Sequence, residues 1–459
     1  MEARLVLQPA AVAIWAPAFA SSMDIAPGPQ EPVASPHPLA LKTGAVLFGH
    51  ASHGPYASTV SWRSLTAGPA TAGAVRHLGM LAVQTMRRQL VAACGTHQPR
   101  ARARRPTAHR SKGSLAFRMS RAEYNATFAA ATHLPGREEF WLDVARREID
   151  WFVEPTKALR PRIPGEHPTN DWFPDGQTNL SINALDRHVA AGNGHRTAIA
   201  YHSTVGGNSR EISYQQMLDD VASFAGALRD LGVEAGDRVL LYMPMIPESA
   251  VAMLACTRIG AVHSVVFGGF AASELAVRID DAAPKVVIAA TCGLEGGKGA
   301  IPYMPAVNES IDLAKHHVPS VVVVRRKEEA ANSVKYDLKP GRDHDFAAMV
   351  ASPSRADPVS LSANAPLYTI YTSGTTGDPK GILRDNSHAV TLKWSMTAYY
   401  GTESGETFFA ASDIGWVVGH SYIVYAPLLH GCTSVMFEGK PVGTPDAGTY
   451  STDVCVIDY

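Results

Sequence analysis

Residues 371–381 read Tyr-Thr-Ser-Gly-Thr-Thr-Gly-Asp-Pro-Lys-Gly and follow an apolar run that predicts a strand. Gly374 and Gly377 let the backbone turn its N–H groups toward an anion, and Lys380 adds a positive charge. Neighbouring hydroxyl groups can donate further hydrogen bonds. The sequence therefore predicts a phosphate-binding loop with ligand contacts from Thr372, Ser373, Gly374, Thr375, Thr376, Gly377 and Lys380.

Two other interpretations of this stretch carry less weight. A solvated turn rich in Ser, Thr and Gly is common, but eleven restricted positions after a strand are more than such a turn requires. A Walker-type loop is excluded because that motif ends in Gly-Lys-Ser/Thr, whereas Lys380 follows Pro379 and precedes Gly381. Kinases and nucleoside triphosphatases that depend on that motif are therefore disfavoured.

The segments that must position this loop alternate between strand and helix patterns. Strand patterns cover residues 197–201, 238–243, 261–267, 285–290, 321–324, 367–371, 408–411 and 433–437. Helix patterns begin after Ser213, where Gln216 forms a capping-box signature, and also cover residues 247–260, 273–281, 390–399 and 421–429. This alternation predicts right-handed crossovers and an α/β fold in which a parallel sheet is covered by helices. Residues 325–332 are rich in Lys, Glu and Asn and predict a surface loop.

The net charge of −1 conceals two parts of opposite sign. Residues 1–122 hold 14 Lys and Arg against three acids, and no acid lies between residues 32 and 122. An Arg-rich, acid-poor, Ser-containing leader is typical of an organelle transit segment, which predicts a location in the mitochondrial matrix. A disordered basic tail on a cytoplasmic protein is the alternative.

Several classes of site are not indicated. The five cysteines show no paired spacing, so we expect neither a zinc site nor a disulfide framework, and no other metal centre is indicated. No apolar run reaches the roughly 18 residues of a membrane span. The basic leader lacks the interleaved aromatics of a nucleic-acid-binding segment, so we expect no nucleic-acid partner.

The predicted loop resembles the phosphate-loop signature of the adenylate-forming superfamily, which includes the acyl-CoA synthetases. Further blocks resemble the short-chain acyl-CoA synthetases, and they cover residues 242–248, 255–263, 267–270, 411–422 and 438–448. Within that family, residues 380–384 and 393–396 are more similar to the propionyl-CoA synthetase branch than to the acetyl branch. The resemblance extends over residues 124–448.

This resemblance implies a two-step ligase that uses ATP, Mg²⁺ and coenzyme A. A small carboxylate, propionate or acetate, attacks ATP to give an acyl-adenylate and pyrophosphate, and the thiol of CoA then displaces AMP. Lys380 and Thr375 are assigned the catalytic role, since donors and cations aimed at the departing phosphates lower the barrier.

Two further sets of residues take roles from the family's pattern. Trp416, Val417 and Val418 are expected to line the acyl pocket, with a tryptophan on a core strand as the alternative. Glu295, Gly296, Gly297 and Lys298 fall where the family grips CoA, and a plain surface turn is the alternative. His420 is expected to be structural, because the reacting carboxylate has no proton to remove.

The resemblance implies the large N-terminal domain of the acyl-CoA synthetase fold, with mainly parallel sheets layered with helices. We divide the chain into a basic, acid-poor leader (residues 1–122) that we expect to be transit-like and disordered, a helical, aromatic segment with a linker (123–180), the truncated AMP-binding domain (181–448) and a tail (449–459) that departs from the family. Because the family's adenine and Mg²⁺ motif does not follow, we expect a truncated domain that cannot complete adenylation. A non-catalytic regulatory fragment that associates with a complete synthetase is the alternative.

Overall fold

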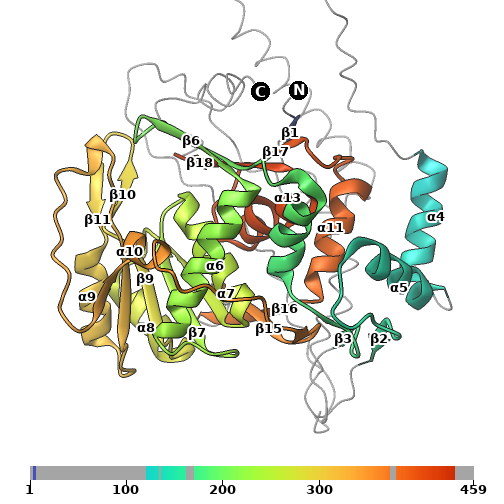
Figure 1. The fold of residues 1–459 in the computed structure, drawn as a ribbon, viewed down its shortest axis with the longest axis horizontal. Coiled ribbons are helices and arrows are strands. Elements are labelled where there is room, and N and C mark those ends of the chain that lie inside the picture. Colours follow the sequence, from blue (N-terminus) through green and yellow to red (C-terminus); the bar gives the residue numbers. More distant parts are fainter. Residues whose placement is uncertain (1–3, 7–119, 134–135, 162–169, 373–378, 440–459) are drawn as a thin grey trace, which may run out of the picture. The chain divides into compact units, whose positions relative to one another are not determined.

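A computed structural model describes residues 4–6, 120–133, 136–161, 170–372 and 379–439 (Figure 1). Two larger sheets organise these residues, together with three two-stranded ribbons. The larger sheets share one continuous buried core, which includes Phe224 and Leu240. No helix in these ranges is both long and apolar enough to cross a membrane.

The larger sheet has seven strands in the order β13-β12-β9-β7-β8-β15-β16. All neighbours are parallel except β16, which runs antiparallel to β15. The strands are β7 (Arg238–Met243), β8 (Val262–Phe267), β9 (Val286–Ala290), β12 (Ser320–Val324), β13 (Asp343–Asp345), β15 (Pro366–Thr372) and β16 (Lys380–Asp385). The central strands are buried on both faces, as expected for parallel strands covered by helices.

The second sheet has five strands in the order β1-β17-β18-β5-β6, of which only β6 is antiparallel to its neighbour. Its strands are β1 (Arg4–Val6), β5 (Thr197–Ser203), β6 (Asn208–Ser213), β17 (Thr407–Ala410) and β18 (Thr433–Glu438). The ribbons pair β2 (Leu159–Arg160) with β3 (Asp171–Trp172), β4 (Gln177–Thr178) with β14 (Leu361–Ser362), and β10 (Cys292–Glu295) with β11 (Gly299–Pro302).

Helices α6 (Tyr214–Asp230) and α7 (Pro247–Ile259) pack against each other and connect the two sheets (Figure 1). α6 contacts β5 and β6, whereas α7 contacts β7 and β8. The Ser213 hydroxyl accepts a hydrogen bond from the Gln216 amide at the start of α6. α7 begins with Pro247 and ends at Gly260, whose φ of 78° is readily adopted by glycine.

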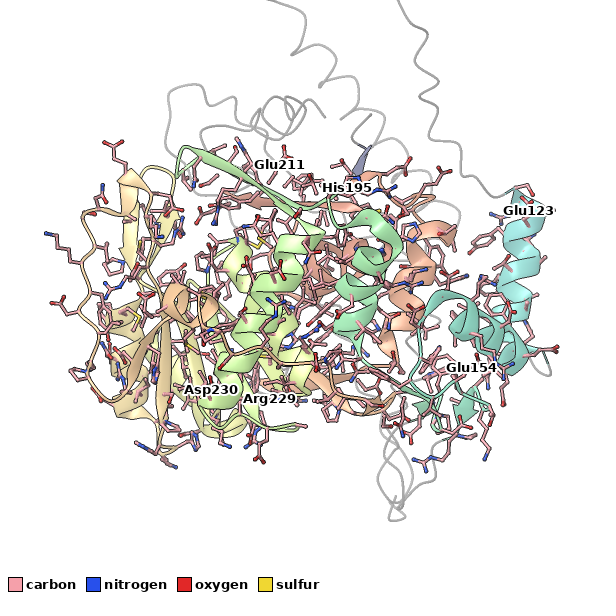
Figure 2. The ribbon with its side chains drawn as sticks, viewed as in Figure 1. Glu123, Glu154, His195, Glu211, Arg229 and Asp230 are labelled. Carbon is pink, nitrogen blue, oxygen red and sulfur yellow. The ribbon has the colours of Figure 1, made fainter. Side chains whose placement is uncertain are left out.

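The N-terminal segment consists of helices α4 (Arg121–Thr132) and α5 (Arg137–Glu148). Figure 2 shows Glu123 at the first turn of α4, where it forms a reciprocal capping box with Ser120. Beyond them, an aromatic cluster of Phe140, Trp141, Trp172 and Trp394 joins the segment to α11 (His388–Ala398). The prediction of short helices that anchor aromatic side chains is thus confirmed.

The remaining helical segments are short or lie on the surface of the sheets. They are η1 (Ile182–Asp186), η2 (Val189–Asn193), α8 (Ala272–Ala282), α9 (Met304–Leu313), η3 (Glu329–Ala331), α10 (Phe346–Val350), α12 (Val417–Gly419), η4 (His420–Tyr425) and α13 (Ala426–His430). The predicted α/β class is confirmed. The strands are divided between two sheets, however, whereas the alternation of patterns alone suggested one.

Candidate functional site

The parallel strands of the two sheets meet at their carboxyl ends, which we call the seam. Arg326 follows β12, Glu438 ends β18, and their side chains form two contacts of 2.7 and 2.9 Å. Phe267 ends β8, and its ring centroid lies 6.3 Å from that of Trp416, which follows β17. In α/β proteins, ligands bind outside the carboxyl ends of parallel strands. The seam is therefore the candidate site.

The predicted phosphate loop leaves the seven-stranded sheet at this carboxyl edge. Strand β15 leads into it and β16 returns from it, with Thr372 paired opposite Lys380. Lys380 and Gly381 are exposed. The predicted contacts at Ser373, Gly374, Thr375, Thr376 and Gly377 lie outside the described residues, so these contacts stay a prediction. Strand β16 itself was missed by the sequence analysis, which predicted only the incoming strand.

Helix α8 holds the strand end that leads into the loop. The Tyr371 hydroxyl donates a 2.5 Å hydrogen bond to Asp281. The Arg278 guanidinium lies over two rings, 5.5 Å from the centroid of Tyr371 and 4.7 Å from that of Phe270. Burial, helped by the bond to Asp281, raises the pKa of Tyr371, which keeps its hydroxyl protonated. Contacts with α8 thus hold the Tyr371 ring in place at the start of the loop.

A shallow depression of about 340 Å³ lies beside this contact, on the face of β8, β15 and β16 that Tyr371 shares. Its lining includes Ser264, Thr369, Leu383 and Arg238. The nitrogens of Arg238 already bond backbone carbonyls of Gly236, Ala282 and Ala283. With its one cation engaged in this way, the depression is a poor phosphate site compared with the exposed Lys380.

His420 is buried at the start of η4, and its Nδ1 lies 3.3 Å from the carbonyl oxygen of Trp416. Burial lowers the pKa of His420 to about 4, so the ring is neutral at neutral pH. Its ring stacks with His263 and lies 4.7 Å from Tyr368. This environment agrees with a structural role for His420.

The predicted acyl-pocket residues lie at the start of α12. The Trp416 side chain is 51% exposed and Val417 is 43% exposed, while Val418 packs partly against the core. Trp416 is the N-cap residue of a short helix, so the alternative of a tryptophan on a core strand is wrong. A Cβ at Gly419 would lie 1.8 Å from the Asp413 carbonyl oxygen, which explains the glycine after these residues. Their pocket role stays a prediction.

The predicted CoA contact forms the turn of the β10–β11 hairpin. Gly297 has φ of 77°, and the exposed Lys298 ammonium lies 3.0 Å from the Glu295 carboxylate. Glu295 pairs opposite Gly299 at the end of the ribbon. This geometry suits a surface turn whose lysine can reach an anion, and the CoA role stays a prediction.

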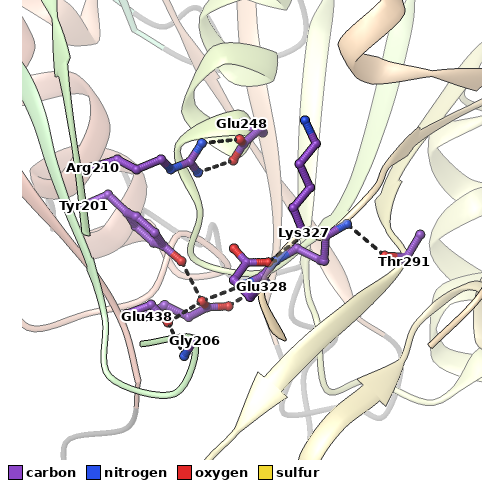
Figure 3. A network of polar contacts seen from close by, with 10 residues as sticks. Tyr201, Gly206, Arg210, Glu248, Thr291, Lys327, Glu328 and Glu438 are labelled. Carbon is purple, nitrogen blue, oxygen red and sulfur yellow. Dashed lines mark hydrogen bonds and ion pairs between the residues drawn. The ribbon is translucent and has the colours of Figure 1, made fainter. Parts of the chain in front are cut away.

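Sequence reasoning missed a buried polar network at the seam (Figure 3). Glu438 accepts hydrogen bonds from Arg326, from Tyr201 (2.7 Å) and from Ser203 (2.8 Å). Arg326 also donates to Glu328 at 2.8 Å. Because Arg326 and Glu328 are buried, the prediction that residues 325–332 form a surface loop is wrong for these two positions. A glutamate ending the apolar strand pattern of residues 433–437 was the one available signal.

A second missed feature is Tyr303, which is buried between the turn after β8 and strand β10. A Cβ at Gly268 would lie 2.3 Å from the Tyr303 hydroxyl, and one at Gly293 would lie 2.2 Å from it. Both glycines are therefore needed for this close approach. Burial is the main reason that the pKa of Tyr303 is raised. Side chains of this kind cannot be recognised from spacing, because the three residues meet only in the fold.

Two family models match the chain. One is described as an AMP-binding enzyme and matches residues 186–453. The other is described as the N-terminus of acetyl-coenzyme A synthetase and matches residues 124–184.

Curated relatives cover a similar part of the chain. A Mus musculus protein named acyl-CoA synthetase short-chain family member 3, mitochondrial, is 47% identical over 332 residues, 72% of this chain and 47% of the relative. The propionate–CoA ligase of Escherichia coli (strain K12) is 45% identical over 320 residues, 69% and 49% of the two chains. An uncharacterized Pseudomonas aeruginosa protein is 50% identical over 312 residues, 68% and 48% of the two. The chain spans about half the length of the curated relatives that it matches.

Proposed function

The chain belongs to the AMP-binding enzyme family, and from that premise we propose that it is a short-chain acyl-CoA synthetase. In the proposed reaction, a short carboxylate, ATP and CoA give acyl-CoA, AMP and pyrophosphate. The observation that carries the proposal is the Gly-, Ser- and Thr-rich loop whose flanking strands, β15 and β16, leave and re-enter the carboxyl edge of a parallel sheet. Relatives named for acyl-CoA synthetase and propionate–CoA ligase activities support the same reaction class.

In the first proposed step, a carboxylate oxygen attacks the α-phosphorus of ATP. The bond from that phosphorus to its bridging oxygen breaks, and pyrophosphate leaves with the electron pair. Since both reactants are anions, hydrogen-bond donors and cations aimed at the departing phosphates lower the barrier most. We assign this role to Lys380 and Thr375, with the other loop residues (Thr372, Ser373, Gly374, Thr376 and Gly377) holding the phosphates.

In the second proposed step, the CoA sulfur attacks the acyl carbonyl carbon of the adenylate. The bond from that carbon to the phosphate oxygen breaks, AMP leaves, and the thiol proton passes to solvent. We assign CoA binding to the turn of Glu295, Gly296, Gly297 and Lys298. The exposed ammonium of Lys298 supports this role, because a lysine at a solvent-facing turn can pair with a phosphate group.

Mg²⁺ enters this proposal as the partner of ATP. The described residues contain no group of three or more His, Cys, Asp or Glu side chains that could hold a metal ion. Mg²⁺ keeps several waters and is commonly bound through substrate phosphates with one or two carboxylates, so a dedicated cage is not required. When bound, the ion supplies positive charge to the phosphate groups.

We propose propionate and acetate as the acids, with propionate preferred. Trp416, Val417 and Val418 are assigned to the wall that limits the acyl chain, and their place beside Phe267 at the seam supports this assignment. Each methylene in such a pocket is worth only about 1–3 kcal/mol, so the two acids are separated weakly.

We further propose that residues 1–122 direct the protein to the mitochondrial matrix. Their Arg-rich, acid-poor composition supports this location, as do relatives whose names describe them as mitochondrial. Fusing residues 1–122 to a fluorescent protein tests this proposal. Mitochondrial fluorescence is expected, and a diffuse cytoplasmic signal would contradict it.

The function is tested by titrating the purified chain with Mg-ATP in a calorimeter and by following propionate-dependent exchange of labelled pyrophosphate into ATP. We expect saturable ATP binding that Lys380→Ala weakens. A folded chain that binds no ATP would refute the proposal. The expectation that this chain cannot complete adenylation stays a prediction, and exchange with propionate would refute it. Weaker exchange with butyrate would then establish the acid class.

A further inference from the structure

The network around Arg326 connects three strand ends that are distant in sequence. The Arg326 guanidinium follows β12 and binds both oxygens of Glu438, at 2.7 and 2.9 Å. The same carboxylate accepts hydrogen bonds from Tyr201 on β5 and from Ser203 at the end of β5. Figure 3 shows Glu438 and Glu328 side by side at the centre of this network. One carboxylate therefore holds the ends of β5, β12 and β18 together.

The β10–β11 hairpin is connected to this network through Thr291. The Arg326 amide donates to the Thr291 hydroxyl at 3.1 Å, and the Thr291 amide donates to the Val324 carbonyl at 2.9 Å. Thr291 is the residue directly before β10. The base of the hairpin is thus tied to the same turn of chain that carries the arginine.

The body of the hairpin rests on a small apolar cluster that is separate from the main core. Cys292 and Leu294 of β10 pack with Ala331 of η3, and Val205 lies against them. Each support comes from a segment that the network fixes. Glu328, directly before η3, accepts a hydrogen bond from Arg326. Val205 lies in a turn that is closed by a 2.8 Å hydrogen bond from the Gly206 amide to the Ser203 hydroxyl.

The charges in this network are almost fully removed from water. The side chains of Arg326 and Glu438 are 2% and 4% exposed. Burial by itself would lower the pKa of Arg326, but its hydrogen bonds to Glu438 and Glu328 outweigh burial and raise it. A buried ion pair adds little net stability relative to an apolar pair, but removal of one partner leaves an uncompensated charge. A network of this kind fixes geometry more than it stabilises the fold.

We propose that Arg326 and Glu438 are positioning residues, whose ion pair fixes the β10–β11 hairpin, and the turn at Lys298, relative to the end of β18. The inference rests on the proposed function in one respect, because that turn is the proposed contact for CoA. It assigns to the buried pair an effect on CoA binding and none on ATP binding, since the hydrogen bonds described above link the network to β5, β12, β18 and the start of β10.

The test compares Glu438→Gln with a matched control. Glu248→Gln breaks the neighbouring pair in Figure 3, in which Arg210 also binds both carboxylate oxygens, at 2.8 and 3.0 Å. That pair joins β6 to α7, and although the Arg210 guanidinium lies over the Tyr201 ring, neither residue belongs to the hairpin or to the apolar cluster beneath it. Dissociation constants for CoA and Mg-ATP are measured by calorimetry, and amide hydrogen exchange of residues 292–302 is measured by mass spectrometry.

For Glu438→Gln we expect a CoA dissociation constant raised about tenfold, an ATP dissociation constant within about twofold of wild type, and faster exchange of the hairpin amides. Arg326→Lys, which keeps the charge but not the two-pronged contact, should lie between wild type and Glu438→Gln. Glu248→Gln should change none of the three. If Glu438→Gln does not fold, Ser203→Ala removes one bond to the carboxylate and should show the same pattern at smaller size.

Equal effects of Glu438→Gln and Glu248→Gln, or equal weakening of both ligands, would overturn the inference. If the wild-type chain binds no CoA, the proposed function is contradicted and the positioning role is not. In that case the hydrogen exchange decides: unchanged protection of residues 292–302 in Glu438→Gln overturns the positioning role, and faster exchange supports it.

Discussion

The imidazole rings of His263 and His420 lie nearly parallel, with planes 6° apart and centroids 5.6 Å apart, although one belongs to β8 and the other to η4. Both rings are fully buried, and the Nε2 atom of His263 lies 2.9 Å from the Tyr425 hydroxyl. Burial lowers the pKa of both side chains, for His420 to about 4. Because both imidazoles are neutral in the folded protein, the stability of the packing at the seam should depend on pH.

The first prediction is acid destabilisation through His420. Its pKa is near 6.5 in the unfolded chain and about 4 in the folded protein, so only the unfolded chain gains the proton as pH falls through this window. His420 should therefore cost about 2 kcal/mol of stability between pH 6.5 and pH 5. Urea unfolding at several pH values measures this, and His420→Gln should reduce the slope by this share, because burial also lowers the pKa of His188, His263 and His388.

His317→Gln is the control for this prediction, because His317 is exposed. The pH dependence of the free energy of unfolding is compared between the two variants. A dependence that is as steep in His420→Gln as in wild type would show that other groups cause the acid sensitivity.

The second prediction concerns the ion pair between Lys393 and Glu148, 2.6 Å apart and only 13% and 15% exposed. It joins α11 to α5, next to the edge-to-face rings of Trp141 and Trp394. Lys393→Met leaves Glu148 without this partner and should lower the free energy of unfolding by about 3 kcal/mol. Urea unfolding followed by tryptophan fluorescence reports the change directly at this junction.

Asp143→Asn provides the comparison, because the pair of Asp143 with Arg147 is exposed (71% and 55%). Exposed pairs contribute below about 1 kcal/mol, so this variant should unfold close to wild type. Similar losses in the two variants would show that burial does not distinguish the pairs.

The third prediction concerns the exposed Lys380. Lys380→Ala should raise the dissociation constant for Mg-ATP about 10- to 100-fold, since hydrogen bonds to charged groups contribute roughly 1.5–3 kcal/mol. Thermal unfolding should be unchanged, because the side chain lies at the start of β16 and is exposed. Lys335→Ala, at another exposed lysine, is the control and should bind ATP as wild type does.

The fourth prediction separates stability from acid preference at Trp416. With its indole 51% exposed, Trp416→Ala should cost well below the roughly 3–5 kcal/mol of a buried tryptophan. It should also raise affinity for a pentanoyl-adenylate analogue relative to a propionyl analogue, because the wall of the acyl pocket is removed. An unchanged ratio of the two affinities would show that Trp416 does not line the acyl pocket.

Much of the fold could be predicted because the decisive signals are local. The strand pattern at residues 238–243 matches β7, and the Ser213 cap and Gly260 stop lie where their local chemistry requires. Strands β6 and β16 were missed, since neither has a continuous apolar run and each lies at the edge of its sheet among the described residues. Local sequence does not specify such pairing.

The site was predictable in part for a related reason. The proposed phosphate loop could be read from the sequence because its residues are contiguous, from Thr372 to Lys380, and its ligand contacts stay a prediction. Arg326 could not be placed in the core, because the carboxylate that makes its burial tolerable is Glu438, on a strand of the other sheet. The close packing of Tyr303 against Gly268 and Gly293 could not be predicted for the same reason, because the three residues are distant in sequence.

The proposed ligand contacts lie in turns, strand ends and the short helix α12, whereas the interiors of the central strands are mainly apolar. The residues assigned to the acid and those that hold the core are therefore largely different. A change in the proposed acid preference would need substitutions at only a few positions outside the strands, which leaves the hydrophobic framework unaltered.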